Sequence, residues 1–262
     1  MILVETIADH LESLAPSALA AEWDNVGLLV GSRESPVARL MTCLTITAET
    51  VAEAIEQQAD LIVVHHPLPF RPLKRLTRQS PEGRYLLDLI AENIAIYSGH
   101  TAFDSAATGI NQRLAEGIGL ENIEPLEAID TDVRVGAGRC GSPAEETTSA
   151  ELATRIKSFL EIEHLRLVGR SEQTLKRVAV ACGSAGSFLE AACAKGCDAI
   201  LTGETSFHTC LAAEADGVAL FLAGHFASER FAMQELAEEL ANSFGELEVW
   251  ASRDEKDPIQ LL

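Results

Sequence analysis

A short apolar run that ends in two histidines is the feature that most constrains this chain. Leu61-Ile62-Val63-Val64 is mostly β-branched and contains no polar residue, and His65, His66 and Pro67 follow it directly. Such a run predicts a strand that is buried on both faces, which is typical of a parallel sheet covered by helices. In these sheets, ligands bind beyond the carboxyl ends of the strands. We therefore expect the two histidines to lie at a ligand site, and imidazoles make a metal ion the first candidate.

Strand and helix patterns alternate along the whole chain. An apolar run at 39–46 is followed by a helix pattern at 48–58, which Thr47 can cap, and then by the strand at 61–65. This alternation predicts an α/β fold with mixed, mainly parallel sheets. We expect the other helices at 3–14, 81–93, 110–118, 149–160, after 187 and from 226 to 242. We expect the other strands at 26–30, 94–98, 132–139, 164–168, 176–182, 198–202, 218–223 and 247–250.

The length of 262 residues predicts one large domain or two small ones. Residues 121–131 are acidic and turn-like, so we place a boundary between two lobes there. We assign residues 1–125 to an N-terminal α/β lobe, which the C-terminal segment 224–262 completes. Residues 126–223 then form a second α/β lobe.

Charge and composition narrow the possible partners. The net charge is -20, from 40 acidic and 20 basic residues, so we expect neither nucleic acid nor an anionic membrane as a partner. No apolar run reaches the roughly 18 residues that span a bilayer. We expect a soluble, cytoplasmic protein whose six cysteines are reduced. Cys193 and Cys197 have a spacing that suits half of a metal site, but the apolar residues around them favour core packing.

Histidines and carboxylates recur at the expected strand ends. Five of the seven histidines lie there: His65, His66, His100, His208 and His225. Asp104 follows His100 by four residues, Glu229 follows His225 by four, and His208 follows Glu204 by four. Imidazole and carboxylate donors suit zinc, iron, manganese or cobalt, and the sequence does not choose among these metals. Because adjacent side chains on an extended strand diverge, His65 and His66 suit two metal ions, or one ion and a supporting role, better than chelation of one ion.

Two loops have two interpretations each. Trp23-Asp24 can line a site or can anchor a turn, and the glycine-rich segment 182–187 can bind an anion or can be a tight turn. That segment lacks the Gly-Lys-Ser/Thr of a P-loop. No Gly-x-Ser-x-Gly occurs, and no Gly-x-Gly-x-x-Gly follows the first strand, so serine hydrolases and dinucleotide-binding enzymes are unsupported.

The motifs together resemble the Nif-three-like family, whose members are known as type 2 homologues of GTP cyclohydrolase I. The resemblance covers nearly the whole chain, and its motifs occur in the family's order. They are Trp23-Asp24-Asn25-Val26-Gly27-Leu28, His65-His66-Pro67, His100-Thr101-Ala102-Phe103-Asp104, Thr202-Gly203-Glu204 through His208, and Gly224-His225-Phe226-Ala227-Ser228-Glu229-Arg230. The resemblance implies two linked α/β lobes, a dinuclear metal centre in the cleft between them, and a toroidal homohexamer.

Carried over by position, the resemblance implies five metal ligands: His65, His66, Asp104, His225 and Glu229. Either carboxylate can be the one that bridges two ions, and His100 is expected to support the site or to move protons. Two positions depart from the family's usual aspartates. Glu204 is a conservative change, whereas Thr45 would orient a ligand histidine more weakly than a carboxylate does.

The leading hypothesis is a dinuclear metal-dependent hydrolase that acts on a nucleotide-like or other small polar substrate, with GTP as the named candidate. Two divalent ions per chain would activate water, His100 would move protons, and Trp23-Asp24 would help to line the site. The alternative is a metal-binding protein without turnover, such as a metal carrier, a metal-insertion factor or a regulatory scaffold. Proton-transfer groups beyond the ligands would favour the enzyme, and exposed ligands would favour the carrier.

Overall fold

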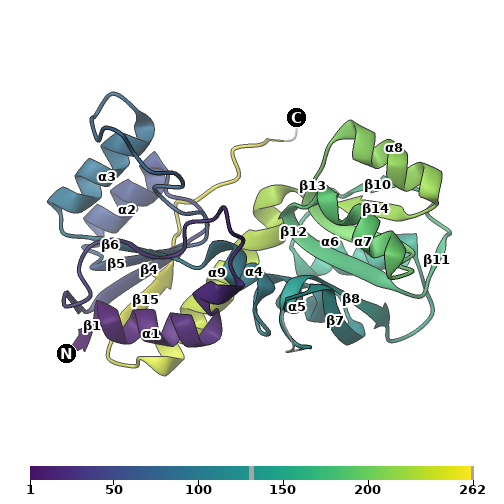
Figure 1. The fold of residues 1–262 in the computed structure, drawn as a ribbon, viewed down its shortest axis with the longest axis horizontal. Coiled ribbons are helices and arrows are strands. Elements are labelled where there is room, and N and C mark those ends of the chain that lie inside the picture. The colour runs from purple at the N-terminus through teal and green to yellow at the C-terminus, as the bar shows by residue number, and fades with distance from the viewer. Residues whose placement is uncertain (130–132, 261–262) are drawn as a thin grey trace. The chain divides into compact units, whose positions relative to one another are not determined.

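The computed structural model describes residues 1–129 and 133–260, and the chain forms two compact α/β units (Figure 1). Unit 1 comprises Met1–Phe103 and Ala232–Leu262, and unit 2 comprises Asp104–Phe231. The chain passes from one unit to the other within two helices, α4 (His100–Ser105) and α9 (His225–Ser243). Each unit has its own sheet and its own core, which confirms the predicted α/β class.

Unit 1 is built on a five-stranded sheet in the order β15-β4-β5-β6-β2. Its strands are β2 (Gly27–Val30), β4 (Arg39–Cys43), β5 (Leu61–Val64), β6 (Ala95–Ser98) and β15 (Glu248–Ala251). Every pairing is parallel except that of β2 with β6. The apolar run that ends in two histidines is therefore a central strand, paired on both sides as its composition predicts.

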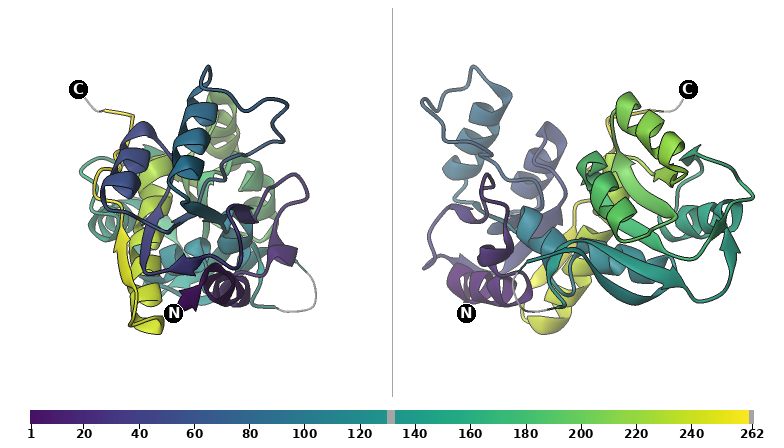
Figure 2. Two further views of the ribbon diagram at one scale, coloured as in Figure 1. Left: turned by 90° about the vertical axis from the view of Figure 1, so that its left-hand side faces the viewer. Right: turned by 45° about the vertical axis from the view of Figure 1, so that its right-hand side comes forward.

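Helices cover both faces of this sheet. The helices α2 (Ala48–Glu56) and α3 (Pro81–Ala91) lie on one face, and α1 (Val4–Leu14) and the later part of α9 lie on the other (Figures 1 and 2). Thr47 caps α2 by accepting a hydrogen bond from the Thr50 amide, as the sequence predicts. The short strands β1 (Ile2–Leu3) and β3 (Pro36–Val37) pair with each other, and a 3-10 turn spans Ser17–Leu19.

Unit 2 is built on a six-stranded sheet in the order β10-β14-β13-β12-β8-β7. Its strands are β7 (Leu120–Ala128), β8 (Gly136–Pro143), β10 (Arg166–Val168), β12 (Val178–Ser184), β13 (Ala199–Glu204) and β14 (Ala219–Leu222). Only β12, β13 and β14 run parallel to one another, so this sheet is mixed rather than mainly parallel. A separate two-stranded sheet pairs β9 (Thr147–Thr148) with β11 (Thr174–Leu175).

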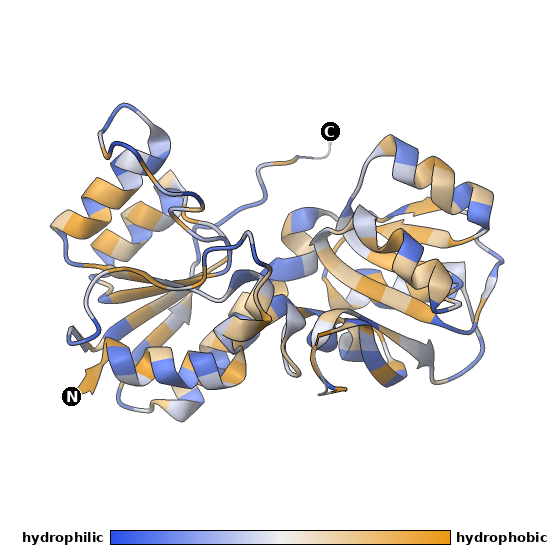
Figure 3. Cartoon of the chain, in the orientation of Figure 1, coloured by the Kyte–Doolittle hydropathy of each residue, from blue (hydrophilic) through white to orange (hydrophobic). Residues whose placement is uncertain are grey.

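The helices of unit 2 also pack on both faces of its sheet. A 3-10 turn at Gly186–Phe188 leads into α7 (Leu189–Ala194), which shares a core with α8 (Phe207–Asp216). The helix α5 (Ile110–Gly117) packs against β12, β8 and β7, and α6 (Ser149–Phe159) contacts α5. Apolar residues are concentrated along the strands of both sheets (Figure 3).

The prediction that residues 121–131 are turn-like is wrong for most of that segment. Leu120–Ala128 form β7, which among the described residues pairs with β8 and lies at the edge of the sheet. Residues 130–132 lie outside the described part of the chain. An edge strand can expose acidic side chains and can accommodate Pro125, and both features weakened the strand pattern in the sequence. The strand expected at 132–139 is β8, and the first residue of that range is outside the described residues.

None of the helices within residues 1–129 and 133–260 combines the length and hydropathy that a membrane span requires. No disulfide links the six cysteines, all of which lie in this part of the chain.

Candidate metal centre

Three histidines meet at the carboxyl end of the unit 1 sheet. His65 and His66 directly follow β5, and His100 opens α4 just after the neighbouring strand β6. The ring centroid of His65 lies 5.1 Å from the centroid of His66 and 5.1 Å from that of His100. The centroids of His66 and His100 are 5.7 Å apart. One ring nitrogen from each residue lies within 4.8 Å of the others, so the three can hold a metal ion. The parallel pairing of β5 with β6 brings these imidazoles together, as predicted from strand ends.

Two of these rings are oriented by oxygen atoms at their Nδ1 positions. Thr45 Oγ1 lies 2.7 Å from His66 Nδ1, and Asp24 Oδ1 lies 2.6 Å from His100 Nδ1. Partners of this kind fix the orientation of a metal-binding or proton-transferring imidazole and direct Nε2 toward the site. Thr45 therefore does contact a candidate ligand through its hydroxyl group.

Asp24 is an integral part of this cluster rather than only a turn anchor. Its side chain is buried, and besides His100 it accepts hydrogen bonds from the Thr101 amide at 3.1 Å and the Thr101 hydroxyl at 2.5 Å. Burial alone would raise the pKa of Asp24, but the hydrogen bonds from His100 and Thr101 lower that pKa to about 2. Asp24 is therefore a carboxylate at neutral pH. His100 itself has a φ of +25°, a strained conformation of the kind that is concentrated at functional sites.

A second carboxylate, Glu255, supports the loop that carries Thr45. It accepts hydrogen bonds from the backbone amides of Leu44 at 3.0 Å and Thr45 at 2.6 Å. Glu255 lies 210 residues from Thr45 in the sequence, and no local motif marks it. Sequence reasoning missed this residue for that reason.

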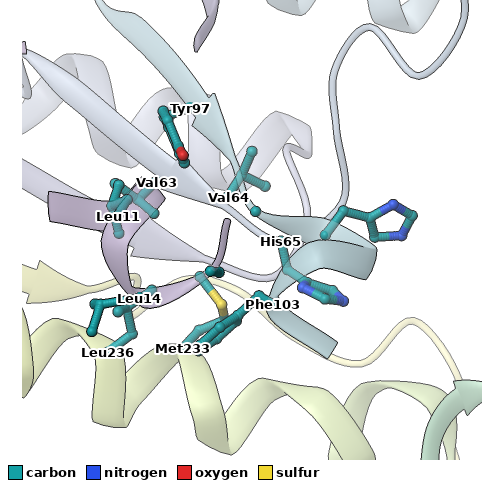
Figure 4. Close-up of a pocket in the computed structure, with 12 residues that line it drawn as sticks. Leu11, Leu14, Val63, Val64, His65, Tyr97, Phe103, Met233 and Leu236 are labelled. Atoms are coloured by element: carbon teal, nitrogen blue, oxygen red, sulfur yellow. The ribbon is translucent and has the colours of Figure 1, made fainter. Parts of the chain in front are cut away.

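Apolar side chains gather on one side of His65 and enclose a small cavity in unit 1 (Figure 4). They come from α1, α9 and the ends of β5 and β6, and include Leu11, Leu14, Met233 and Leu236. The cavity measures about 20 Å³, which is room for one water molecule. It is too small to hold a substrate, so we treat it as a packing feature beneath the histidines.

In unit 2, His225 stands between two carboxylates. It opens α9 directly after β14, with Nδ1 2.9 Å from Glu204 Oε1 and Nε2 3.1 Å from Glu229 Oε2. The hydrogen bond with Glu229 contributes most to raising the pKa of His225 to about 9; burial opposes this rise, and the charges of both carboxylates add to it. The same negative field attracts a divalent cation. The sequence paired Glu204 with His208 by spacing, but His208 is exposed on α8 and Glu204 bonds to His225 instead.

Asp104 is held by a buried network that the sequence did not predict. The Asn111 amide group donates a hydrogen bond to the Asp104 carbonyl at 3.1 Å and accepts one from the Cys182 amide at 2.8 Å. The Cys182 thiol donates to Asp104 Oδ1 at 3.3 Å. Burial, and then the charges of Asp104 and Glu229, raise the pKa of that thiol, so it remains a proton donor. Asn111 thereby ties α4 to the end of β12.

The glycine-rich turn after β12 allows Glu229 to approach the backbone closely. Gly183 has a φ of +64°, and a Cβ atom there would lie 2.2 Å from Glu229 Oε1. The Gly183 amide donates to Ser228 Oγ at 3.0 Å, which fixes the start of α9 against the turn. These contacts support the tight-turn interpretation of residues 182–187.

The donors in both units fit a divalent transition metal. Imidazole nitrogens and carboxylate oxygens are the ligands that zinc, iron, manganese and cobalt bind. The fold and these residues define an α/β protein of two units with candidate His/Glu metal sites.

Comparison with known proteins then gives the family. The family model described as Duf34/NIF3 (NGG1p interacting factor 3) matches residues 2–258, so the chain belongs to this family. The resemblance found in the sequence motifs is thus confirmed.

Relatives match over the full length of the chain. It is 33% identical over 257 residues to a "GTP cyclohydrolase 1 type 2 homolog" of Clostridium perfringens, covering 98% of both chains. It is 35% identical over 263 residues to the "GTP cyclohydrolase 1 type 2" of Helicobacter pylori strain 26695, covering 100% of both. The crystal structure of Staphylococcus aureus protein SA1388 superposes with a TM-score of 0.90 at 28% identity, covering 100% of this chain and 99% of that one.

Proposed function

We propose that the chain is a metal-dependent hydrolase whose metal ligands are His65, His66, Asp104, His225 and Glu229. A bound divalent ion would supply a water molecule of lowered pKa, which is a nucleophile at neutral pH. Support for the set comes from its chemistry, since all five side chains are imidazoles or carboxylates that zinc, iron, manganese or cobalt accept. Two divalent ions per chain are the proposed content, with His65 assigned to one ion and His66 to the other because the two are adjacent in the sequence.

The observation that carries the choice of an enzyme is the hydrogen bond between Asp24 and His100. The buried Asp24 carboxylate accepts from the Nδ1–H of His100 and stabilises that ring when it gains a second proton at Nε2. His100 can therefore take a proton and return it, which is the task of a general acid and base. In a protein that only carries metal, the same carboxylate would orient His100 as a ligand, so a His100 variant that keeps its metal but loses turnover separates the two roles.

The alternative, a metal carrier, is favoured by one observation in unit 2. The side chains of His225 and Glu204 are 32% and 43% exposed, so solvent or a partner can reach them. Ligand exchange is faster at exposed donors than at buried ones. We place the carrier second because exposure of a ligand is also needed for a substrate to enter.

The proposed substrate class is nucleotide-like or another small polar molecule. GTP is the named candidate because the Helicobacter pylori relative is called GTP cyclohydrolase 1 type 2. We also propose a cytoplasmic homo-oligomer, with a hexamer as the expected assembly, because the motifs of the Nif-three-like family imply it. Light scattering of the purified chain measures that assembly directly.

A turnover assay tests the proposed function. Metal-loaded protein is incubated with GTP and a panel of other nucleotides and phosphoesters, and products are separated by chromatography. We expect turnover of at least one compound, loss of that turnover in His100→Gln with metal content retained, and no change in His164→Gln, an exposed histidine of unit 2. No turnover across the panel, together with ready metal transfer to an apo-protein, would instead establish the carrier.

A further inference from the structure

Two exposed aromatic rings flank His100 in unit 1. Trp23 is 64% exposed and Phe70 is 39% exposed, although large apolar side chains are usually covered. The Trp23 ring centroid lies 6.0 Å from that of His100, the Phe70 centroid lies 6.1 Å from it, and the two aromatic centroids are 5.9 Å apart. All three pairs are edge-to-face, so the rings do not stack on one another. A planar ligand can stack on such a ring.

The loops that carry these rings are fixed in place. The Asn25 side chain donates a hydrogen bond to the Pro69 carbonyl at 2.6 Å, which joins the loop of Trp23 to the loop of Phe70. Asp24, next to Trp23, is bonded to His100. The two rings are therefore held beside the histidines before any ligand arrives, and such preorganisation lowers the entropic cost of binding.

The segment after Phe70 is basic, in contrast to the rest of the chain. Arg71, Lys74 and Arg75 are all exposed, and the Arg71 guanidinium lies 5.9 Å from the centroid of the Phe70 ring. The chain as a whole carries a net charge of -20. A local cluster of positive charge attracts anions, whereas the acidic remainder of the surface repels them.

We propose that Trp23, Phe70, Arg71, Lys74 and Arg75 form a recognition surface for a planar, anionic small molecule. The ring of the ligand stacks on Trp23 or Phe70, and its phosphate or carboxylate groups pair with the basic side chains. Nucleotides belong to this class, whereas uncharged polar molecules and plain phosphoesters do not. The inference rests on the proposed function, because the surface selects what reaches His100. It also narrows that function to ring-bearing anions.

Calorimetric titration with three probes separates the parts of this surface. Full-length protein, both as purified and after EDTA treatment, is titrated with GTP, guanosine and inorganic tripolyphosphate. Removing one stacking contact costs about 1–3 kcal/mol of binding free energy. We therefore expect Trp23→Leu to lower the affinity for GTP and for guanosine by roughly 5- to 150-fold and to leave the affinity for tripolyphosphate unchanged. We expect Arg71→Gln with Arg75→Gln to weaken GTP and tripolyphosphate only, and to flatten their salt dependence.

Matched controls come from exposed residues of unit 2. Phe207 is 72% exposed beside His208, and Arg166 and Arg170 are exposed, so Phe207→Leu and the double change Arg166→Gln with Arg170→Gln repeat the same alterations elsewhere. We expect wild-type affinities in both.

Two results would overturn the inference. One is unchanged GTP affinity in the Trp23 and Arg71/Arg75 variants. The other is that these variants form a smaller assembly than the wild type in light scattering while their affinity for GTP is intact. The surface would then be an interface with a second copy of the chain rather than a ligand site. Failure of the proposed function gives a different result. In that case GTP would still bind to the EDTA-treated protein in calorimetry, but the metal-loaded protein would turn over no nucleotide.

Discussion

Replacing Asn111 with leucine should loosen the end of β12 and the start of α5 while nearly conserving side-chain volume. Asn111 is 3% exposed, and its two hydrogen bonds join the Asp104 carbonyl to the Cys182 amide. Leucine can make neither bond. Each buried polar group left without its partner costs about 1–3 kcal/mol, so we expect a loss of about 3 kcal/mol in the local free energy of opening.

Hydrogen exchange followed by mass spectrometry measures this loss where it occurs. A change of 3 kcal/mol corresponds to about 150-fold faster exchange, because about 1.4 kcal/mol gives a factor of ten. We expect that acceleration in peptides from Val178–Ser184, and unchanged exchange in Arg39–Cys43 of unit 1 as an internal control. Because Asp104 is a proposed ligand, metal affinity should fall as well. Unchanged protection of β12 in Asn111→Leu would refute the network as we describe it.

Three further predictions concern buried charges. Burial alone would raise the pKa of Glu53, but hydrogen bonds from side-chain and backbone donors lower that pKa below its usual value. The ionised Glu53 carboxylate therefore stabilises the fold at neutral pH, and this stability is lost as the pH falls through the lowered pKa. Glu53→Gln should cost about 2–4 kcal/mol in urea unfolding at about pH 7 and less at about pH 3, and an equal loss at both would contradict this. Arg139 is fully buried and donates to several backbone carbonyls, so Arg139→Met should destabilise unit 2 by about 3 kcal/mol or more; an unchanged melting temperature would count against that role. Hydrogen bonds from Cys197 and Arg177 lower the pKa of the Cys140 thiol below its usual value, so thiolate absorbance in the ultraviolet should appear at a lower pH in the native protein than in the unfolded protein, and Cys140→Ser should remove this difference.

The parts of the fold that the sequence predicted are those with local signals. The run at Leu61–Val64 is apolar because β5 is paired on both sides and covered on both faces, so its composition alone indicated a central strand. The four-residue spacing of His225 and Glu229 placed both on one side of α9, and the structure finds them 3.1 Å apart. In β7, Pro125 and several exposed glutamates obscured the strand, since an edge strand tolerates proline and exposed charged side chains.

The supporting residues were not predictable, because each depends on contacts between distant parts of the chain. Asn111 gives no signal within α5, and it matters only because the fold brings Asp104 and Cys182 to its side chain. Glu255 acts on a loop 210 residues away. The sequence left open whether Asp24 lines a site or anchors a turn, and its hydrogen bond with His100 places it in the site. The five-ligand set as a whole remains a prediction from family motifs.

Metal analysis of the purified chain is the most direct test of the central claim. We predict about two divalent ions per chain by elemental mass spectrometry, since the proposed ligands suit two ions. His66→Ala and Glu229→Ala should each lose at least one of them, while His164→Ala, which alters an exposed histidine outside the proposed set, should retain both. Full metal content in both ligand variants, or no bound metal in the wild-type chain after incubation with zinc, iron, manganese and cobalt, would contradict the account.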